Sequence, residues 1–323
     1  MKQLRDHHLT RILTVCIILI AGYLLYQNDT TPHEEMTIKG FNIVVLPDTQ
    51  HYSESYPEIL CNQTQWIRDN KDSQNIMFAV QLGDIVEHGA ARPLEWQRAS
   101  DCFGILDTQV PYSIVPGNHD SNHVSENTSG FSMYNSIFPA SRFNNESWYR
   151  GNYDNNQNSY QIIDADGMSM LFLSLEVEPS DADIKWAQGV LTEHSDSYAI
   201  LITHKYLPDT GLKRDNHLSF SKDGNTGEAT WNKLVSKNCN IKLVLGGHYH
   251  ENDGENRLES TNSCGDTVHQ VTQDYQSRDS GGDGKLRIYN FIPEEKKIKV
   301  RTYSPYTDTY ETDADSEFEL PLN

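Results

Sequence analysis

IKLVLGGHYH, residues 241–250, is an apolar run that stops at two glycines and then carries two histidines. A short, mostly apolar run bounded by turn residues is typical of a buried strand. Five more runs share this character: FNIVVLP (41–47), NIMFAVQL (75–82), YSIVPG (112–117), MSMLFLSL (168–175) and YAILITH (198–204). Stretches with helical spacing lie between them, near residues 57–70, 93–106, 181–194 and 229–237. The alternation predicts an α/β fold in which sheet and helices form layers.

Two other regions have a different pattern. TVHQVTQDY (267–275), KLRIYNFI (285–292) and KIKVRTYS (297–304) follow one another without helical spacers, which predicts an antiparallel second sheet. Residues 121–159 are rich in Asn, Ser and Tyr and lack a clear periodicity. Because they follow a candidate active-site loop, we expect them to form a cap over the site.

The N-terminal part predicts export. Residues 12–26, ILTVCIILIAGYLLY, are apolar and uncharged, with basic residues before them and acidic residues after them. This pattern predicts a cytoplasmic n-region at 1–11, a membrane segment at 12–26, a linker at 27–39 and a folded domain at 40–323. The run is shorter than the roughly 20 residues of a comfortable span, so a cleaved signal peptide stays open beside a signal-anchor. In either case the domain is expected outside the cytoplasm, in the periplasm or at the cell surface.

The net charge bears on which partners the protein can bind, and the cysteines bear on the compartment in which it folds. The 26 Lys and Arg stand against 46 Asp and Glu, a net charge of -20 that argues against nucleic-acid binding. Apart from Cys16 in the apolar run, the chain has an even set of four cysteines, which in an oxidising compartment predicts two disulfides, Cys61 with Cys102 and Cys239 with Cys264. Four buried thiols are the alternative. The oligomeric state stays open.

Five short motifs each follow an expected strand. They are Asp48-Thr49-Gln50, Gly83-Asp84, Gly117-Asn118-His119-Asp120, Thr203-His204 and Gly247-His248-Tyr249-His250. Each motif alone has an ordinary structural explanation, such as a turn or a helix cap. Because strand ends are where layered α/β folds place ligands, we expect the five to converge. Together they offer oxygen and nitrogen ligands suited to two divalent ions.

A pair of ions suits the hydrolysis of phosphate esters. Two metals about 3.5 to 4 Å apart lower the pKa of a bridging water and clamp the phosphoryl oxygens. One carboxylate must then contact both ions.

The ordered set D-x-Q, GD, GNHD, H and GHxH resembles the calcineurin-like metallophosphoesterase family over about residues 41–303, and in particular its exported bacterial members. The resemblance implies a four-layer α-β-β-α sandwich of two packed mixed β-sheets, with a dinuclear metal site at the strand ends. It implies two sets of ligands and one bridge: Asp48, Gln50 and His250 for one ion, Asn118, His204 and His248 for the other, and Asp84 between them. It also implies two catalytic residues: His119, which acts on the leaving oxygen, and Asp120, the family's second acid, which orients that loop.

Two positions depart from the family pattern. Gln50 stands where most members have histidine. A minority of the family, including the manganese-dependent ADP-ribose and CDP-alcohol diphosphatases, resembles this chain in having D-x-Q. An amide oxygen favours manganese, with magnesium, iron and zinc as alternatives. Glu87-His88 stands where phosphoprotein phosphatases have an Asp-Arg pair, which argues against a Ser/Thr protein phosphatase. Lys205, Arg92 or Arg278 could supply the missing charge, although each is more often an ordinary surface residue.

Four residues beside the motifs are candidates for substrate binding: His51, His88, Lys205 and Tyr249. An aromatic rim that stacks a nucleoside or sugar is one interpretation of the aromatic side chains near the site in sequence, and ordinary core or rim packing is the other. These side chains are His51, Tyr52, Tyr206, Tyr249 and Tyr275.

The expected function is that of an exported metal-dependent phosphoesterase, which hydrolyses a small phosphorylated substrate by attack of a metal-bridging hydroxide. A phosphodiesterase or nucleotide diphosphatase is the alternative within the enzymes. A non-catalytic, metal-stabilised binding module is the alternative outside them.

Overall fold

A computed structural model of the chain describes residues 39–124 and 130–322. The elements below belong to one compact unit, Gly40–Asn323. The expected membrane segment, residues 12–26, lies outside the described residues. None of the helices in the described part combines the length and the hydropathy of a membrane span.

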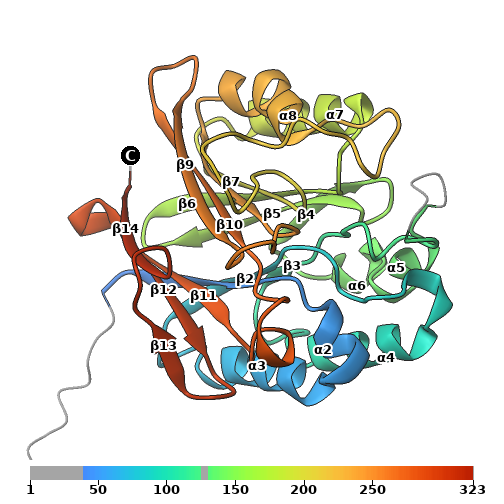
Figure 1. Ribbon diagram of the computed structural model, residues 1–323. Coiled ribbons are helices and arrows are strands. Elements are labelled where there is room, and N and C mark those ends of the chain that lie inside the picture. Colours follow the sequence, from blue (N-terminus) through green and yellow to red (C-terminus); the bar gives the residue numbers. More distant parts are fainter. Residues whose placement is uncertain (1–38, 125–129, 323) are drawn as a thin grey trace, which may run out of the picture. The chain divides into compact units, whose positions relative to one another are not determined.

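Two mixed sheets form the centre of the unit (Figure 1). The first has the order β13-β12-β11-β1-β2-β3, with β14 paired to β12. Its strands are β1 (Phe41–Leu46), β2 (Ile76–Gln81), β3 (Tyr112–Ser113), β11 (Leu286–Ile292), β12 (Lys297–Ser304), β13 (Thr309–Glu311) and β14 (Glu317–Pro321). The second sheet has the order β4-β5-β6-β7-β8-β10-β9. Its strands are β4 (Tyr149–Tyr153), β5 (Asn158–Ala165), β6 (Met168–Leu175), β7 (Tyr198–Thr203), β8 (Ile241–Gly246), β9 (Glu255–Thr261) and β10 (Thr267–Gln273).

Helices cover the outer face of each sheet, which gives four layers (Figure 1). The α-helices are α2 (Gln50–Ser55), α3 (Pro57–Asp69), α4 (Pro93–Phe103), α5 (Ser132–Ile137), α6 (Ala140–Phe143), α7 (Asp181–Glu193) and α8 (Gly227–Lys233). Short 3-10 turns are η1 (Gly89–Ala91), η2 (Val235–Lys237), η3 (Asp279–Gly281) and η4 (Pro293–Glu295). The predicted four-layer α-β-β-α sandwich is confirmed.

Alternate residues of the central strands serve two different cores. Ile43 and Val45 of β1 face the second sheet, where they pack with residues such as Phe172 of β6. Val44, between them, faces α3 and α4 on the other side. Both faces of these strands are therefore buried, which explains why their sequence is apolar without alternation.

Local signals fix the ends of the main helices. Pro57 and Pro93 stand at the first helical positions of α3 and α4, where a missing N–H costs nothing. At α7, Ser180 and Asp183 form a capping box in which each side chain accepts a hydrogen bond from the other's backbone N–H. These helices begin where the sequence predicted.

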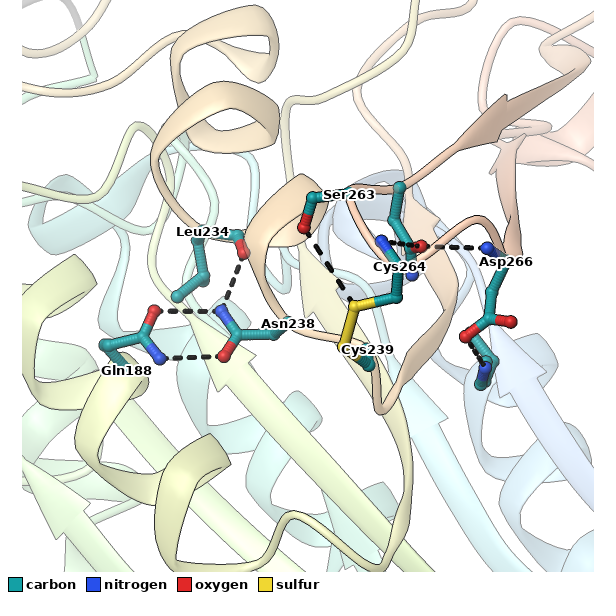
Figure 2. The surroundings of a disulfide bond; sticks show 9 residues. Gln188, Leu234, Asn238, Cys239, Ser263, Cys264 and Asp266 are labelled. Carbon is teal, nitrogen blue, oxygen red and sulfur yellow. Dashed lines mark hydrogen bonds and ion pairs between the residues drawn. A yellow bond between two sulfur atoms is a disulfide. The ribbon is translucent and has the colours of Figure 1, made fainter.

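Both predicted disulfides are present. Cys61–Cys102 links α3 to α4, and Cys239–Cys264 links the start of β8 to the turn between β9 and β10. Figure 2 shows the second bond, beside the paired amides of Gln188 and Asn238. Each disulfide thus joins elements separated in the sequence.

The C-terminal strands do not form a sheet of their own, contrary to the sequence prediction. β10 lies beside β8 in the second sheet and runs parallel to it, whereas β11 and β12 extend the first sheet next to β1. Apolar pattern identified these strands, but it carries no information on which sheet each one joins.

Two further expectations need correction. YSIVPG forms a strand only at Tyr112–Ser113, and the rest of it leads into the site as a loop. Residues 131–143 do not form a separate cap, because Phe131, Tyr134 and Phe138 are buried in the same core as Trp96 of α4. This part of residues 121–159 instead completes the helical layer.

Candidate active site

All five motifs lie at the same edge of the sandwich because of how the strands run. β1, β2 and β3 are parallel neighbours, so the motifs that follow them emerge side by side. β7 and β8 are parallel neighbours in the other sheet and deliver the remaining two motifs. Parallel strands therefore collect at one place side chains that lie up to two hundred residues apart, as in the hydrogen bond from the His248 backbone N–H to Asp48 Oδ2.

His204 lies at the centre of one group of ligands. Its Nδ1 is 3.0 Å from the backbone oxygen of Leu82, which holds the proton on that nitrogen. Its Nε2 is 3.2 Å from Asp84 Oδ2, 3.1 Å from Asn118 Oδ1 and 3.2 Å from His248 Nδ1. Four potential ligand atoms therefore face one point, an arrangement that takes either a proton or a metal ion.

The pKa shifts of the side chains around His204 also suit a site for a proton or a metal ion. Burial acts to raise the pKa of Asp84, but His204, His119 and His248 outweigh it and hold that pKa below its ordinary value. Burial acts to lower the pKa of His204, and Asp84 outweighs it and raises that pKa. Burial and His204 lower the pKa of His248 to about 3, so its ring is neutral and can act as a ligand at neutral pH.

Asp48 and Gln50 form a second group with free oxygen atoms. Asp48 Oδ2 accepts the His248 N–H at 3.0 Å. Gln50 Nε2 donates to Glu87 Oε2 at 2.8 Å, which turns the amide oxygen the other way. Among the described residues, Asp48 Oδ1 and Gln50 Oε1 are buried and receive no N–H or O–H. Buried acceptors in this state suit a cation.

His250, the remaining predicted ligand of this second group, is held at its Nδ1 by the hydroxyl of Ser277. The donor set of the two groups, with carboxylate and amide oxygens and histidine nitrogens, fits two divalent ions.

The backbone around these oxygens leaves no room for larger residues. A Cβ on Gly117 would lie 2.2 Å from Asp84 Oδ1, and one on Gly247 would lie 2.0 Å from Asp48 Oδ1. Asp84 and His248 themselves adopt positive φ angles, of 49° and 71°. Strain of this kind persists where the surrounding structure fixes it, and here it aims both side chains into the site.

His119 lies beside the ligands and is fixed at one ring nitrogen. Its Nδ1 donates to the Glu87 backbone oxygen at 2.9 Å, and its backbone N–H donates to Asp84 Oδ1 at 2.8 Å. Burial acts to lower the pKa of His119, but Asp84 and Glu87 outweigh it and raise that pKa. A protonated His119 can therefore give its Nε2 proton to a leaving group.

Asp120 does not face the reacting position, which corrects its assignment as a catalytic residue. Its Oδ1 accepts the N–H groups of Ile85 and Val86 at 2.8 and 3.0 Å, and its Oδ2 accepts that of Gly117 at 2.8 Å. Burial, and then Asp84, raise its pKa to about 7. Asp120 thus ties the Asp84 loop to the Asn118 loop, the orienting role that the family resemblance implied.

Lys205 is wrong as a substrate-binding residue. Its ammonium donates to Glu178 at 2.8 Å, to Asp215 at 2.7 Å and to the backbone oxygen of His217 at 2.6 Å. All three protons are used, and the side chain is 4% exposed. Arg278, a candidate for the missing phosphate charge, is likewise bound to Glu255 and Glu311.

His51 and His88 do lie near the site, in a cluster with acidic neighbours. His88 Nδ1 is 2.8 Å from Glu95 Oε1, and His51 Nδ1 is 3.8 Å from Glu87 Oε2. Their side chains are 35% and 38% exposed, so both can be reached from solvent. The structure leaves them as candidates for substrate contact.

The aromatic side chains are mostly core. Tyr52, Tyr206 and Tyr275 are at most 1% exposed, so they cannot form a stacking rim. Tyr249 lies against His248, with ring centroids 4.8 Å apart. Only Tyr249 of these four tyrosines is placed beside the ligands and partly exposed.

Two residues in the site were missed as participants. Glu87 contacts Gln50, and its Oε2 lies 3.6 Å from His119 Nδ1. From the sequence it was considered only as a departure from the family pattern. Asp274 follows β10, and its carboxyl contacts that of Asp48. Its position after a strand end, like the five motifs, was the signal that could have identified it.

Comparison with known proteins gives the family. The model of the calcineurin-like phosphoesterase family matches residues 41–252. YvnB of Bacillus subtilis is 33% identical over 316 residues, which is 93% of this chain, and the chain spans 23% of the length of that relative.

Among solved structures, a dimetal phosphatase from Danio rerio superposes with a TM-score of 0.56 at 13% identity, over 88% of this chain and 100% of that one. GAP50, the anchor in the inner membrane complex of Plasmodium, superposes with a TM-score of 0.51 at 10% identity, over 88% and 89%. These two likenesses show the fold. The family match shows more: the chain belongs to the calcineurin-like phosphoesterase family, hydrolases that act on phosphate esters at a dinuclear site for divalent metals.

Proposed function

We propose that this protein is an exported, manganese-dependent phosphoesterase that acts on a small phosphorylated substrate outside the cytoplasm. The observation that carries the chemical part is the position of Asp84. This one carboxylate contacts His204 through Oδ2 and the His119 backbone through Oδ1, at the meeting point of loops from both sheets. This position supports a role for Asp84 in joining the two ligand groups.

The reaction uses the ions for activation and the chain for positioning. Two bound divalent ions supply a nucleophile at neutral pH and spread the charge of the phosphoryl oxygens. Asp48, Gln50 and His250 would hold one of them, and Asn118, His204 and His248 the other, with Asp84 between. His119 holds a proton for the leaving oxygen, and its ring is oriented by the Glu87 carbonyl.

Manganese is proposed on the chemistry of the ligands. Gln50 offers an amide oxygen where a histidine would offer nitrogen, and its amide is held in that orientation by Glu87. Oxygen ligands shift preference from zinc toward manganese and magnesium.

Export is proposed on two observations. The disulfides Cys61–Cys102 and Cys239–Cys264 suit an oxidising compartment. The apolar run at residues 12–26 suits a signal-anchor or a signal peptide, and an anchor would make the membrane a partner. Digestion by a protease added to intact cells or spheroplasts tests this proposal, and full protection of the domain would contradict it.

A diester or a pyrophosphate, as in a nucleotide diphosphatase, is a second candidate substrate class. Lys205 and Arg278 are each bound to two carboxylates, and His88 lies within 4.0 Å of Glu54 as well as beside Glu95. A phosphate monoester carries up to two negative charges on one phosphorus, whereas a diester, and each phosphorus of a pyrophosphate substituted at both ends, carries one. An acidic surround therefore favours the substrate with the smaller charge.

The decisive experiment compares substrates on one preparation. Aryl phosphate monoester, aryl phosphate diester and doubly substituted pyrophosphate substrates are assayed after chelation and after addition of Mn²⁺. We expect chelation to abolish turnover and Mn²⁺ to restore it, with the preferred substrate identifying the class. A protein that stays inert with every divalent ion would contradict the enzymatic proposal and favour a metal-stabilised binding module.

His119→Ala separates these two outcomes further. An enzyme loses about 10²- to 10⁴-fold in kcat while its metal content stays unchanged. His217→Ala, at an exposed histidine, is the matched control and should retain full activity.

A further inference from the structure

Asp274 lies in the site but outside the part of the chain that the family model matches, which ends at residue 252. It follows β10, a strand that runs parallel to β8, so it emerges at the same edge as His248 and His250. Its backbone N–H donates to the Gly254 oxygen at 2.8 Å, which ties it to the loop that carries these histidines.

The side chain of Asp274 is 1% exposed and has one atom to spare. Oδ1 accepts the Gln276 N–H at 3.0 Å. Oδ2 is buried and, among the described residues, receives no N–H or O–H, and the same is true of Asp48 Oδ1. The carboxyl groups of Asp274 and Asp48 are in contact with each other.

Two buried carboxyl groups in contact need something positive between or beside them. A shared proton is one solution, and a cation is the other. Asp48 is one of the residues that fit a metal ion, and Gln50 Oε1 offers a further unpartnered oxygen in the same group. A cation there would satisfy three buried oxygen atoms together, whereas one proton satisfies only the two acids.

We propose that Asp274 is an additional oxygen ligand of the ion held by Asp48, Gln50 and His250. This inference rests on the two-metal function proposed above. With Asp84 as the bridge, the ion then has four oxygen-bearing ligands and one histidine. Such a set is hard, so Asp274 makes this half of the site selective for Mn²⁺ or Mg²⁺ over Zn²⁺.

Asp274→Asn tests the proposal because it preserves the shape and removes the charge. Metal-free protein is titrated with Mn²⁺ and, separately, with Zn²⁺ by calorimetry. We expect two Mn²⁺ sites in the wild type and, in the variant, one of them weakened at least about tenfold. The variant should lose more affinity for Mn²⁺ than for Zn²⁺, whereas loss of a purely structural contact would weaken both ions equally.

Asp266→Asn is the matched control, since it removes one charge at an ion pair with Lys242 on β8, outside both ligand groups, and should bind as the wild type does. Asp274→Glu keeps the charge and moves it, so it should weaken Mn²⁺ binding less than Asp274→Asn if the fold is intact.

Unchanged Mn²⁺ affinity in Asp274→Asn overturns the ligand role and leaves the proposed function standing, as would equal losses for both ions. A wild-type protein that binds no Mn²⁺ overturns both.

Discussion

Two buried clusters of charged side chains meet at consecutive residues, Asp274 and Tyr275, and they neutralise their acids in different ways. In the Glu255 cluster, Glu255 accepts from Arg287, from Arg278 at 2.9 Å and from Tyr275 at 3.1 Å. Arg287 is fully buried and joins β11 of the first sheet to β9 of the second. This acid is balanced by cations of the chain itself.

The strand-end cluster, formed by Asp48, Asp84 and Asp274, lacks such a balance. Among the described residues, Asp48 and Asp84 form ion pairs with the single imidazole of His204 and with no lysine or arginine. Burial, Asp274 and Asp84 raise the pKa of Asp48, and burial raises that of Asp274 to about 6.

This difference between the two clusters distinguishes buried acids that stabilise the fold from buried acids that bind a ligand. Acids that serve stability have their partners within the chain, as Glu255 has. Buried acids without a cationic partner in the chain indicate a binding site for cations from solution, here two divalent ions.

The largest effect should come from Asp84→Asn, which removes the carboxylate shared by the two ligand groups. Loss of a shared ligand costs several kcal/mol of transition-state stabilisation, so we expect kcat with Mn²⁺ to fall roughly a thousandfold or more. Metal analysis of the purified variant should show fewer than two ions per chain. Activity within tenfold of wild type would contradict the bridging role.

Arg287→Met tests the other cluster. It leaves Glu255 buried without its main cation, so we expect the free energy of unfolding to fall by about 3 to 5 kcal/mol in urea titration. Mn²⁺ affinity should stay within about twofold, since Arg287 contacts none of the ligands. The double variant Arg287→Met with Glu255→Leu should recover most of the lost stability, and failure to do so would contradict the pairing.

The third and smallest effect concerns Glu178, which is balanced within the chain by Lys205 and by the backbone N–H groups of Ser219, Phe220 and Ser221. Burial acts to raise the pKa of Glu178, but Lys205 and these N–H groups outweigh it and hold that pKa below the ordinary 4.5. Its stabilising contribution is therefore fully present above about pH 4.5 and is lost as pH falls through the lowered pKa.

Glu178→Gln should remove this pH dependence. We expect it to cost about 1 to 3 kcal/mol of unfolding free energy at neutral pH and to give a shallower loss of stability below pH 4.5 than the wild type. Chemical unfolding in chelator at a series of pH values measures both. A variant that follows the wild-type acid limb would contradict the assignment.

Local signals in the sequence predicted the alternation of strands and helices and placed the five motifs at strand ends. Apolar runs such as Phe41–Leu46 identify buried strands, and a polar group directly after such a run must lie at the sheet edge. Asp48, Asp84 and His204 were identified in this way, and the structure brings them together.

The features that the sequence did not predict depend on contacts between residues far apart in the chain. Lys205 follows His204 and looked available for phosphate, but Glu178 and Asp215 take its charge from other parts of the chain. The sheet that each C-terminal strand joins is decided by long-range pairing, as with β11 beside β1. Asp274 directly follows a strand, as the five motifs do, but the antiparallel sheet expected for this strand hid its place, and only the parallel pairing of β10 with β8 brings it to Asp48.

The most direct test of the central claim is a crystal structure of the Mn²⁺-loaded protein with anomalous scattering measured near the manganese edge. The unbalanced charge of the strand-end cluster predicts two anomalous peaks, about 3.5 to 4 Å apart, with Asp84 between them. A map without peaks there, or with a single peak away from Asp84, would contradict it.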